Sequence, residues 1–192
     1  EKWINAAHTL KSRIYLTWSE VESGYYELAL QEAEQGITDQ TGLGDWKALH
    51  GASISERSVW FQFFLSNPDY MGAGKLLVDM LNRDNDSRLG IYFLANGTTD
   101  IVGVSPADSS GSASMLNVVG HFGMSWKPEF VSWYENSFII AECYYKLNNE
   151  EMALQTLNNA LEGIEARWSS LGYSNTCLLY TSDAADELCR VG

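Results

Sequence analysis

Two segments of the chain, one near each end, carry apolar residues at helical spacing. The first segment places four residues on one face of a helix: Leu10, Ile14, Thr17 and Val21. After a turn at Ser23-Gly24, a second helix would present Tyr26, Ala29, Leu30, Ala33 and Ile37 on one face. Apolar residues that recur every three or four positions are typical of amphipathic helices. The pattern therefore predicts a helical hairpin over residues 1–37.

Residues 131–168 repeat this arrangement. The first face here is Tyr134, Phe138, Ala141 and Tyr145, and after a turn at Asn148-Asn149 the second is Ala153, Leu154, Leu157 and Leu161. The tripeptide Ala29-Leu30-Gln31 recurs as Ala153-Leu154-Gln155. A small residue early in the second helix lets two helices approach closely, as in tetratricopeptide-type (TPR-like) hairpins. The expected fold is mainly α with TPR-like hairpins, although generic antiparallel helix pairs would show the same spacing.

The residues between the hairpins, 38–130, have a different texture. Gly, Ser, Asn and Asp become frequent, as in GTTDIVGVSPADSSGSASM. Such composition predicts long loops with short strands, and the stretch from Gly74 to Leu81 predicts one shorter helix. Binding residues commonly lie on loops that a rigid scaffold positions. We therefore expect this insertion to carry the functional site.

Composition excludes several classes of protein. The chain has 192 residues, 45% of them hydrophobic, which is enough for one globular domain with a substantial core. Its formal net charge of −13 would repel the phosphates that a nucleic-acid-binding protein must neutralise. It contains no apolar run of about 18 residues that could span a bilayer. Because the sequence starts at Glu1 without a targeting segment, localisation must be inferred from other features.

No metal or cofactor site is expected. Gly72-Ala73-Gly74-Lys75 lacks the first glycine and the Ser or Thr of a phosphate-binding loop. The acidic stretch at Asp84 and Asp86 lacks the remaining ligands of a calcium loop. The histidines His8, His50 and His121 and the cysteines Cys143, Cys177 and Cys189 show no metal-ligand spacing and no disulfide framework.

Catalysis is also not expected. Glycoside hydrolysis requires two carboxylates roughly 5 to 9.5 Å apart, and Glu129 and Glu135 flank an aromatic stretch. Their separation cannot be fixed from sequence, and most acidic residues of so acidic a chain form a solvated face. We therefore predict a protein that is not an enzyme, with no catalytic residues.

Aromatic side chains are the stronger indication of function. The chain has seven Trp, and many of its rings fall in the insertion. Sugars pack their C–H faces on Trp and Tyr rings while nearby polar groups bind the hydroxyls. Four residues that combine a large ring with a loop context and polar neighbours are predicted to bind glycan: Trp46, Trp60, Tyr70 and Trp126. The alternative is that these rings attach long loops to the helices.

Three segments together resemble the SusD/RagB superfamily of starch-binding, outer-membrane-associated proteins: KWINAAHTLKSRIYL, RDNDSRLGIYF and VSWYENSFIIAECYYKLNNEEMALQTLNNAL. Asp86-Ser87-Arg88-Leu89 stands where the family usually has DPRL. Tyr134-Glu135-Asn136 through Ala141-Glu142-Cys143 resembles the family pattern AE(N/V)xFIxAEA. Ser for Pro and Cys for Ala are departures in framework segments. The resemblance covers most of residues 1–176 in patches.

This resemblance implies a lipid-anchored protein on the outward face of the outer membrane. Such a protein captures oligosaccharide or polysaccharide and delivers it to a TonB-dependent SusC-like transporter. Because family members are much longer, the chain is expected to be an internal fragment of residues 1–176, without the lipidated N-terminus, followed by a non-native tail over 177–192 derived from sequencing adapter. Two alternatives remain open: a TPR-like protein-interaction scaffold without a sugar site, and a helical glycosidase fragment.

Overall fold

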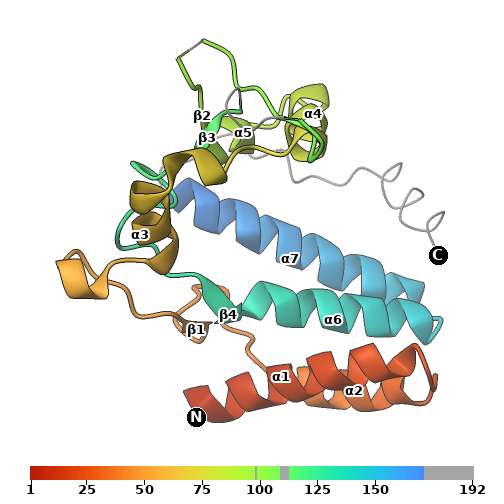
Figure 1. Ribbon diagram of the computed structural model, residues 1–192. Helices are drawn as coiled ribbons and strands as arrows, with labels where there is room; N and C mark the ends of the chain where they lie inside the picture. The colour runs from red at the N-terminus through yellow and green to blue at the C-terminus, as the bar shows by residue number, and fades with distance from the viewer. Residues whose placement is uncertain (98, 109–112, 171–192) are drawn as a thin grey trace. The chain divides into compact units, whose positions relative to one another are not determined.

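The computed structural model describes residues 1–97, 99–108 and 113–170, and these are mainly helical, as predicted (Figure 1). The described residues form two compact units. The helical unit comprises residues 1–47 and 129–170, and the insertion unit comprises residues 48–128. The proposed non-native tail, residues 177–192, lies outside the described residues.

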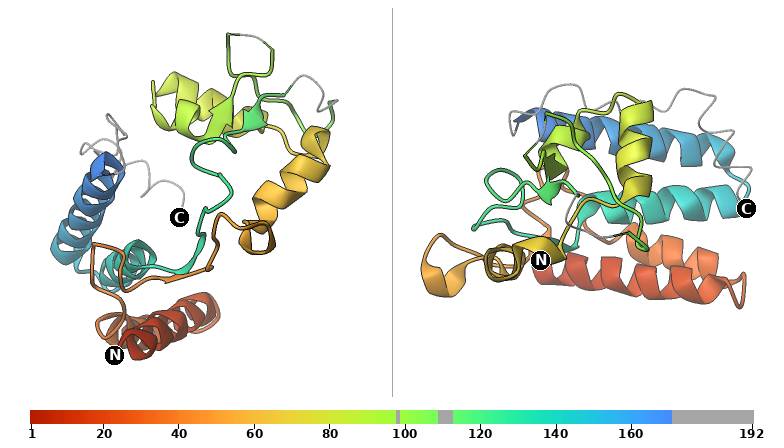
Figure 2. Two further views of the ribbon diagram at one scale, coloured as in Figure 1. Left: turned by 90° about the vertical axis from the view of Figure 1, so that its left-hand side faces the viewer. Right: turned by 45° about the horizontal axis from the view of Figure 1, so that its top comes forward.

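Two helical hairpins build the helical unit. The first consists of α1 (Lys2–Ser19) and α2 (Tyr25–Ala33), and the second of α6 (Trp133–Lys146) and α7 (Glu150–Ser170). The helices of each hairpin pack on each other, and α2 packs on α6, so that α6 lies between α7 and the first hairpin (Figures 1 and 2). The predicted pair of hairpins therefore exists, and the two are stacked.

Helix α1 packs through the face opposite to its apolar one. Its buried residues are Ala6, Thr9, Ser12 and Ser19. The residues of the predicted apolar face, Leu10, Ile14, Thr17 and Val21, are exposed. Small side chains let the helix approach its neighbours closely, because a bulky residue would hold the helix axes apart. The sequence pattern identified the helix and its apolar face correctly, but that face is not the one that packs.

A buried polar group joins the two hairpins. The Thr9 hydroxyl donates to Oδ1 of Asn136 at 3.0 Å and accepts from the backbone N–H of Ile37 at 2.9 Å. The Asn136 amide donates to the carbonyl oxygens of Ala33 and Ile37. These bonds satisfy the polar atoms that burial removes from water, which would otherwise destabilise the fold.

The core of the helical unit uses a different face of α6 from the one expected. Its buried residues are Trp133, Asn136, Ile139, Ala141 and Cys143. Of the predicted face, Ala141 is buried and Tyr134 is half-buried, whereas Phe138 and Tyr145 are exposed. Burial raises the pKa of the Cys143 thiol to about 12. The small residues predicted to allow close helix contacts, Ala29 and Ala153, are both buried.

The chain leaves and re-enters the helical unit through a short antiparallel ladder. Strand β1 (Trp46–Lys47) pairs with β4 (Glu129–Val131), with an irregular register. Immediately after β4, the Ser132 hydroxyl accepts a hydrogen bond from the Glu135 N–H and caps α6. The two ends of the insertion are thus paired with each other directly before α6, a helix of the core.

The insertion unit combines short helices with a second ladder. Its elements are η1 (Ile54–Glu56), α3 (Val59–Ser66), η2 (Pro68–Tyr70), α4 (Lys75–Arg83), α5 (Arg88–Tyr92), β2 (Phe93–Leu94) and β3 (Met115–Leu116). Helix α4 confirms the helix expected near Gly74 to Leu81. The small core of the insertion unit consists of Ala73, Val78, Leu81 and Phe93. Most of this unit is loop, as its composition predicts.

Candidate functional site

A groove in the insertion unit has Tyr70 at its edge. The groove has a volume of about 610 Å³ and is lined by η2, the start of α4 and the segment from Val104 to Asp108. The Tyr70 side chain is 79% exposed, so that its ring is open to solvent. Extended backbone forms the floor, because Gly74 pairs with Val104 as a parallel bridge and the Lys75 N–H donates to the Val104 carbonyl.

Gly72, the first glycine of the Gly72-Ala73-Gly74-Lys75 motif, allows the backbone segments of this floor to approach closely. A Cβ at Gly72 would collide with Cβ of Ala113, because the chain segments lie against each other there. Gly72 pairs with Met115 across the same region. Gly72 therefore serves the close packing of extended segments, whereas a Cβ at Gly74 would meet nothing within 4 Å.

Polar groups surround the exposed ring of Tyr70. Nζ of Lys75 lies 2.8 Å from a carboxylate oxygen of Asp79, one turn further along α4. Asp108 and Ser105 contribute a carboxylate and a hydroxyl to the opposite lining. An open groove with one aromatic face and several hydrogen-bonding groups has the chemistry that binds a sugar ring.

The ladder between β1 and β4 carries a second aromatic surface. Trp46 lies between Asp45 and Lys47, and Phe130 follows Glu129, so the rings and the charged groups alternate along both strands. The Trp46 ring lies 5.5 Å from that of Phe130 and 5.9 Å from that of Trp3, both edge to face. All three rings are exposed. Trp46 thus has aromatic neighbours, Trp3 and Phe130, that the sequence analysis did not select, although the alternation in the strands could have indicated Phe130.

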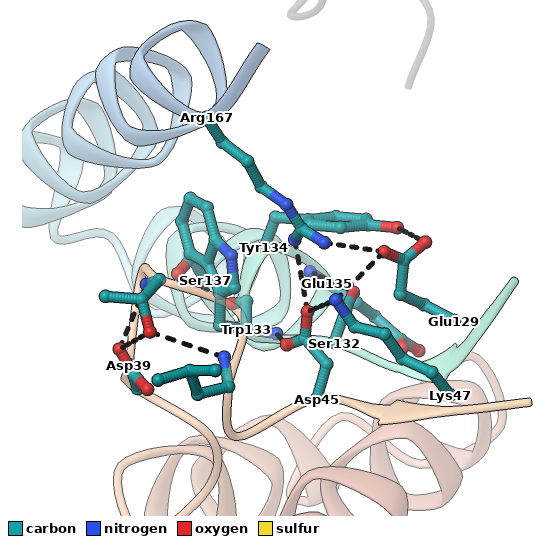
Figure 3. Close-up of polar contacts among 12 residues, drawn as sticks. Asp39, Asp45, Lys47, Glu129, Ser132, Trp133, Tyr134, Glu135, Ser137 and Arg167 are labelled. Carbon is teal, nitrogen blue, oxygen red and sulfur yellow. Dashed lines mark hydrogen bonds and ion pairs between the residues drawn. The ribbon is translucent and has the colours of Figure 1, made fainter. Parts of the chain in front are cut away.

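An ionic cluster lies beside this ladder (Figure 3). The carboxylate of Asp45, whose side chain is fully buried, accepts from the backbone N–H of Trp133 at 2.9 Å and from Arg167 at 3.1 Å. Glu129 accepts from Arg167 at 2.7 Å, and Nζ of Lys47 lies within 3.4 Å of both carboxylates. Since Arg167 belongs to α7, the cluster ties the ladder to the second hairpin. It holds the backbone beside Trp46 in place.

The remaining predicted rings lie elsewhere in the insertion unit. Trp60 is on α3, and its side chain is 53% exposed. Trp126 is half-buried and packs against Phe122 at 5.0 Å and His121 at 6.1 Å. Among the ring contacts of the described residues, none joins two of the four predicted rings. The described residues therefore show no stacked pair among these four rings.

Glu129 and Glu135, the two carboxylates that a glycosidase would need, are both bound by cations. Arg13 forms a two-pronged ion pair with Glu135, and this bond raises the pKa of Arg13. Glu129 is bound by Arg167 and Lys47 and lies 3.4 Å from the Tyr134 hydroxyl, whose pKa burial raises. Two carboxylates that are already paired with cations are poorly placed to exchange protons with a substrate.

Within the part of the chain that the structure describes, no three His, Cys, Asp or Glu side chains gather as a metal site would require. His8 contacts Glu32 at 2.7 Å, and His50 contacts the Glu56 carbonyl. None of the described helices is both long and apolar enough to cross a bilayer.

Comparison with known proteins gives matches in structure. No family model matches the chain, and no curated protein sequence does. The crystal structure of a SusD/RagB family protein from Bacteroides thetaiotaomicron matches with a TM-score of 0.69 and 19% identity, over 88% of this chain and 39% of that one. A chitin-binding protein matches with a TM-score of 0.68 and 16% identity, over 100% of this chain and 44% of that one.

A SusD homologue from Bacteroides vulgatus gives a TM-score of 0.66 and 20% identity, over 88% of this chain and 36% of that one. The chain therefore has the fold of part of a SusD/RagB protein, in agreement with the resemblance of its sequence. It spans less than half the length of each of these three structures.

Proposed function

We propose that the chain binds carbohydrate without chemically changing it, and that the Tyr70 groove is the main contact. The observation that carries the proposal is the combination, in one groove, of a ring that is 79% exposed with carboxylate, ammonium and hydroxyl groups. The surface formed by Trp3, Trp46 and Phe130 would give a second stacking contact. Trp60 and Trp126 remain proposed contacts on chemical grounds alone.

The fold supports a wider role for the protein to which this chain belongs. We propose that this protein captures oligosaccharide or polysaccharide at the outer membrane and passes it to a SusC-like TonB-dependent transporter. Likeness to SusD/RagB proteins over 88% of the chain supports this role. A lipid anchor outside the given sequence would hold such a protein at the membrane.

Replacing Tyr70 by alanine tests the groove. After a glycan array identifies a bound saccharide, calorimetry should show that Tyr70→Ala weakens its binding by about tenfold or more, because a stacked ring is lost. The fold should be unaffected, since the ring is largely in solvent. Ile54→Ala is a matched control, because Ile54 is 77% exposed in the same unit but does not line the groove.

The two possible negative results lead to different conclusions. Unchanged affinity of Tyr70→Ala would show that the saccharide binds elsewhere, and Trp46→Ala, Trp60→Ala and Trp126→Ala would then locate it. If the chain retained no saccharide of the array, carbohydrate binding itself would be wrong.

A second candidate function is a helical scaffold that binds another protein. It is favoured by the outward face of α1, where exposed apolar side chains follow one another along the helix: Trp3, Ile4, Leu10, Ile14 and Trp18, with Val21 just beyond its end. An apolar stripe of this length commonly marks a protein contact. It predicts co-purification with a protein partner and no retention of any glycan.

A further inference from the structure

We propose that the ligand is an uncharged glycan and that the carboxylates of the groove exclude uronic-acid and sulfated polysaccharides. This inference rests on the proposed function, since it specifies the class of saccharide that the groove accepts. It is carried by the charges of the Tyr70 groove: in the described residues, the one cation that lines it is paired with a carboxylate, and the carboxylate of Asp108 lines it as well.

The Tyr70 groove offers an anion no free positive charge. Lys75 is the only basic residue that lines it within the described chain, and its ammonium is paired with Asp79 at 2.8 Å. Asp108, on the other side of the groove, has no ion-pair partner among the described residues. A bound uronate or sulfate would therefore meet one neutralised pair and one uncompensated carboxylate, and it would be repelled.

Three cations beside the second aromatic surface are paired as well, whereas Lys2, the neighbour of Trp3, donates to the Leu43 carbonyl. Lys47 contacts both Asp45 and Glu129, and Arg167 contacts the same two carboxylates. Arg13, which donates to the Phe130 carbonyl, is held by Glu135. An anionic sugar would have to break a pair to bind any of these three cations. Breaking a partly buried pair leaves its carboxylate uncompensated.

A second groove of the helical unit is also lined mainly by negatively charged side chains. A groove of about 490 Å³ along α1 and α6 is lined by Glu129, Glu135 and Glu142, with Arg13 as its only cation in the described residues. The whole chain carries a formal net charge of −13. Long-range repulsion therefore adds to the local effect and acts against anionic polymers at low ionic strength. Neutral sugars, which bind by stacking and hydrogen bonds, are not subject to it.

The experiment compares one glycan backbone in two charge states. The full chain is screened against soluble neutral polysaccharides (starch, mixed-linkage glucan, galactomannan and arabinoxylan) and anionic ones (polygalacturonate, alginate and heparin). The neutral polymer that binds best is then compared with its own carboxymethylated derivative at about 20 mM and about 500 mM salt. We expect the derivative to bind at least about fivefold more weakly at low salt, and the difference to shrink at high salt.

The variant Asp79→Asn tests the charges of the Tyr70 groove itself. This change releases Lys75 and removes one negative charge from the groove, so it should bring the affinities for the neutral glycan and its derivative about fivefold closer. Asp84→Asn changes the net charge equally, but Asp84 is an exposed partner of Arg83 outside the groove. It should leave the ratio of the two affinities near that of the parent chain.

The outcomes separate this inference from the one on which it depends. Binding of the carboxymethylated derivative, or of any anionic polymer, as tightly as the neutral glycan would overturn it while leaving carbohydrate binding intact. It would equally be overturned if Asp79→Asn and Asp84→Asn had the same effect on the ratio. If no polysaccharide bound at all, the proposed function would fail and this inference with it.

Discussion

At the scale of single residues, buried carboxylates with cationic partners fix the backbone around them. Asp45 does so beside Trp46, and Asp86 does so in the insertion unit. Asp86 is buried, accepts from the backbone N–H of Arg88 at 2.9 Å, and forms a two-pronged ion pair with the Arg88 side chain. These two residues belong to the Asp86-Ser87-Arg88-Leu89 motif, whose role as framework the structure explains.

The Asp86 pair should make stability depend on acid pH. Burial alone would raise the pKa of Asp86, but the bonds from Arg88 outweigh it, so the pKa lies below its usual value. A lowered pKa in the folded state stabilises the protein above the unfolded-state value of about 4, and this stabilisation is lost as the pH falls through the folded-state pKa. Asp86→Asn should therefore lower the free energy of unfolding by about 1.5–3 kcal/mol at pH 7.

Denaturant titrations at pH 7, 5, 4 and 3 measure this effect. The difference between parent and Asp86→Asn should narrow below pH 4, because the parent carboxyl then becomes protonated. Asp84→Asn, which changes an exposed pair, should show a small difference at every pH. A gap between parent and Asp86→Asn that stayed constant down to pH 3 would contradict the assigned ion pair.

At the scale of elements, the contact of the two hairpins depends on residues with little or no side chain. Gly36 follows α2, and a Cβ there would collide with the side-chain oxygens of Thr9 and Asn136. These oxygens belong to the buried polar group that joins α1 to α6. The absence of a side chain at Gly36 thus allows a hydrogen-bonded contact between helices that are far apart in sequence.

Two glycine substitutions test this contact. Gly36→Ala should destabilise the chain by about 1–3 kcal/mol, because a methyl group is forced into a filled space. Gly24→Ala is the control: nothing lies within 4 Å of its added Cβ, and its φ of −59° suits any residue. That change should be neutral or stabilise by up to about 1 kcal/mol. Equal denaturation midpoints for the two variants would refute the close contact at Gly36.

At the scale of the whole molecule, the two outer helices of the helical unit differ in character. The outward face of α1 carries large exposed apolar side chains from Trp3 to Trp18, with Lys11 among them, whereas the exposed residues of α7 are mostly polar, with Met152 and Leu154 as the large apolar exceptions. Water solvates a polar helix face readily, while an exposed apolar stripe tends to bind other apolar surfaces. In solution, the exposed face of α1 should therefore bind other apolar surfaces.

A hydrophobic fluorescent dye measures this property. We expect the folded chain to bind the dye, and Leu10→Ser with Ile14→Ser to remove much of the signal with little loss of stability, because Ile14 is 58% and Leu10 36% exposed. Leu154→Ser, which removes one isolated exposed residue from α7, should have little effect. Dye binding that the α1 double variant left unchanged would show that another surface is responsible.

Although it did not identify helices α3 and α5 of the insertion, the sequence by itself determined the helices of both hairpins and α4, the turns of the hairpins and the loop-rich character of the insertion. These features follow from local spacing and from turn residues such as Asn148, which has a positive φ of 60°. It also identified exposed rings such as Tyr70 and Trp60. It could not determine which face of α1 packs, because the most apolar face is the one left in solvent and the packed face is chosen by close approach to Asn136.

Only the tertiary structure brought Asp45, Glu129 and Arg167 together and placed Tyr70 beside Asp79 and Asp108. Such groupings depend on distances between residues far apart in the chain, which local periodicity does not encode. For the same reason, the pairing of cations that underlies the proposed preference for uncharged glycans could be seen only in the folded chain.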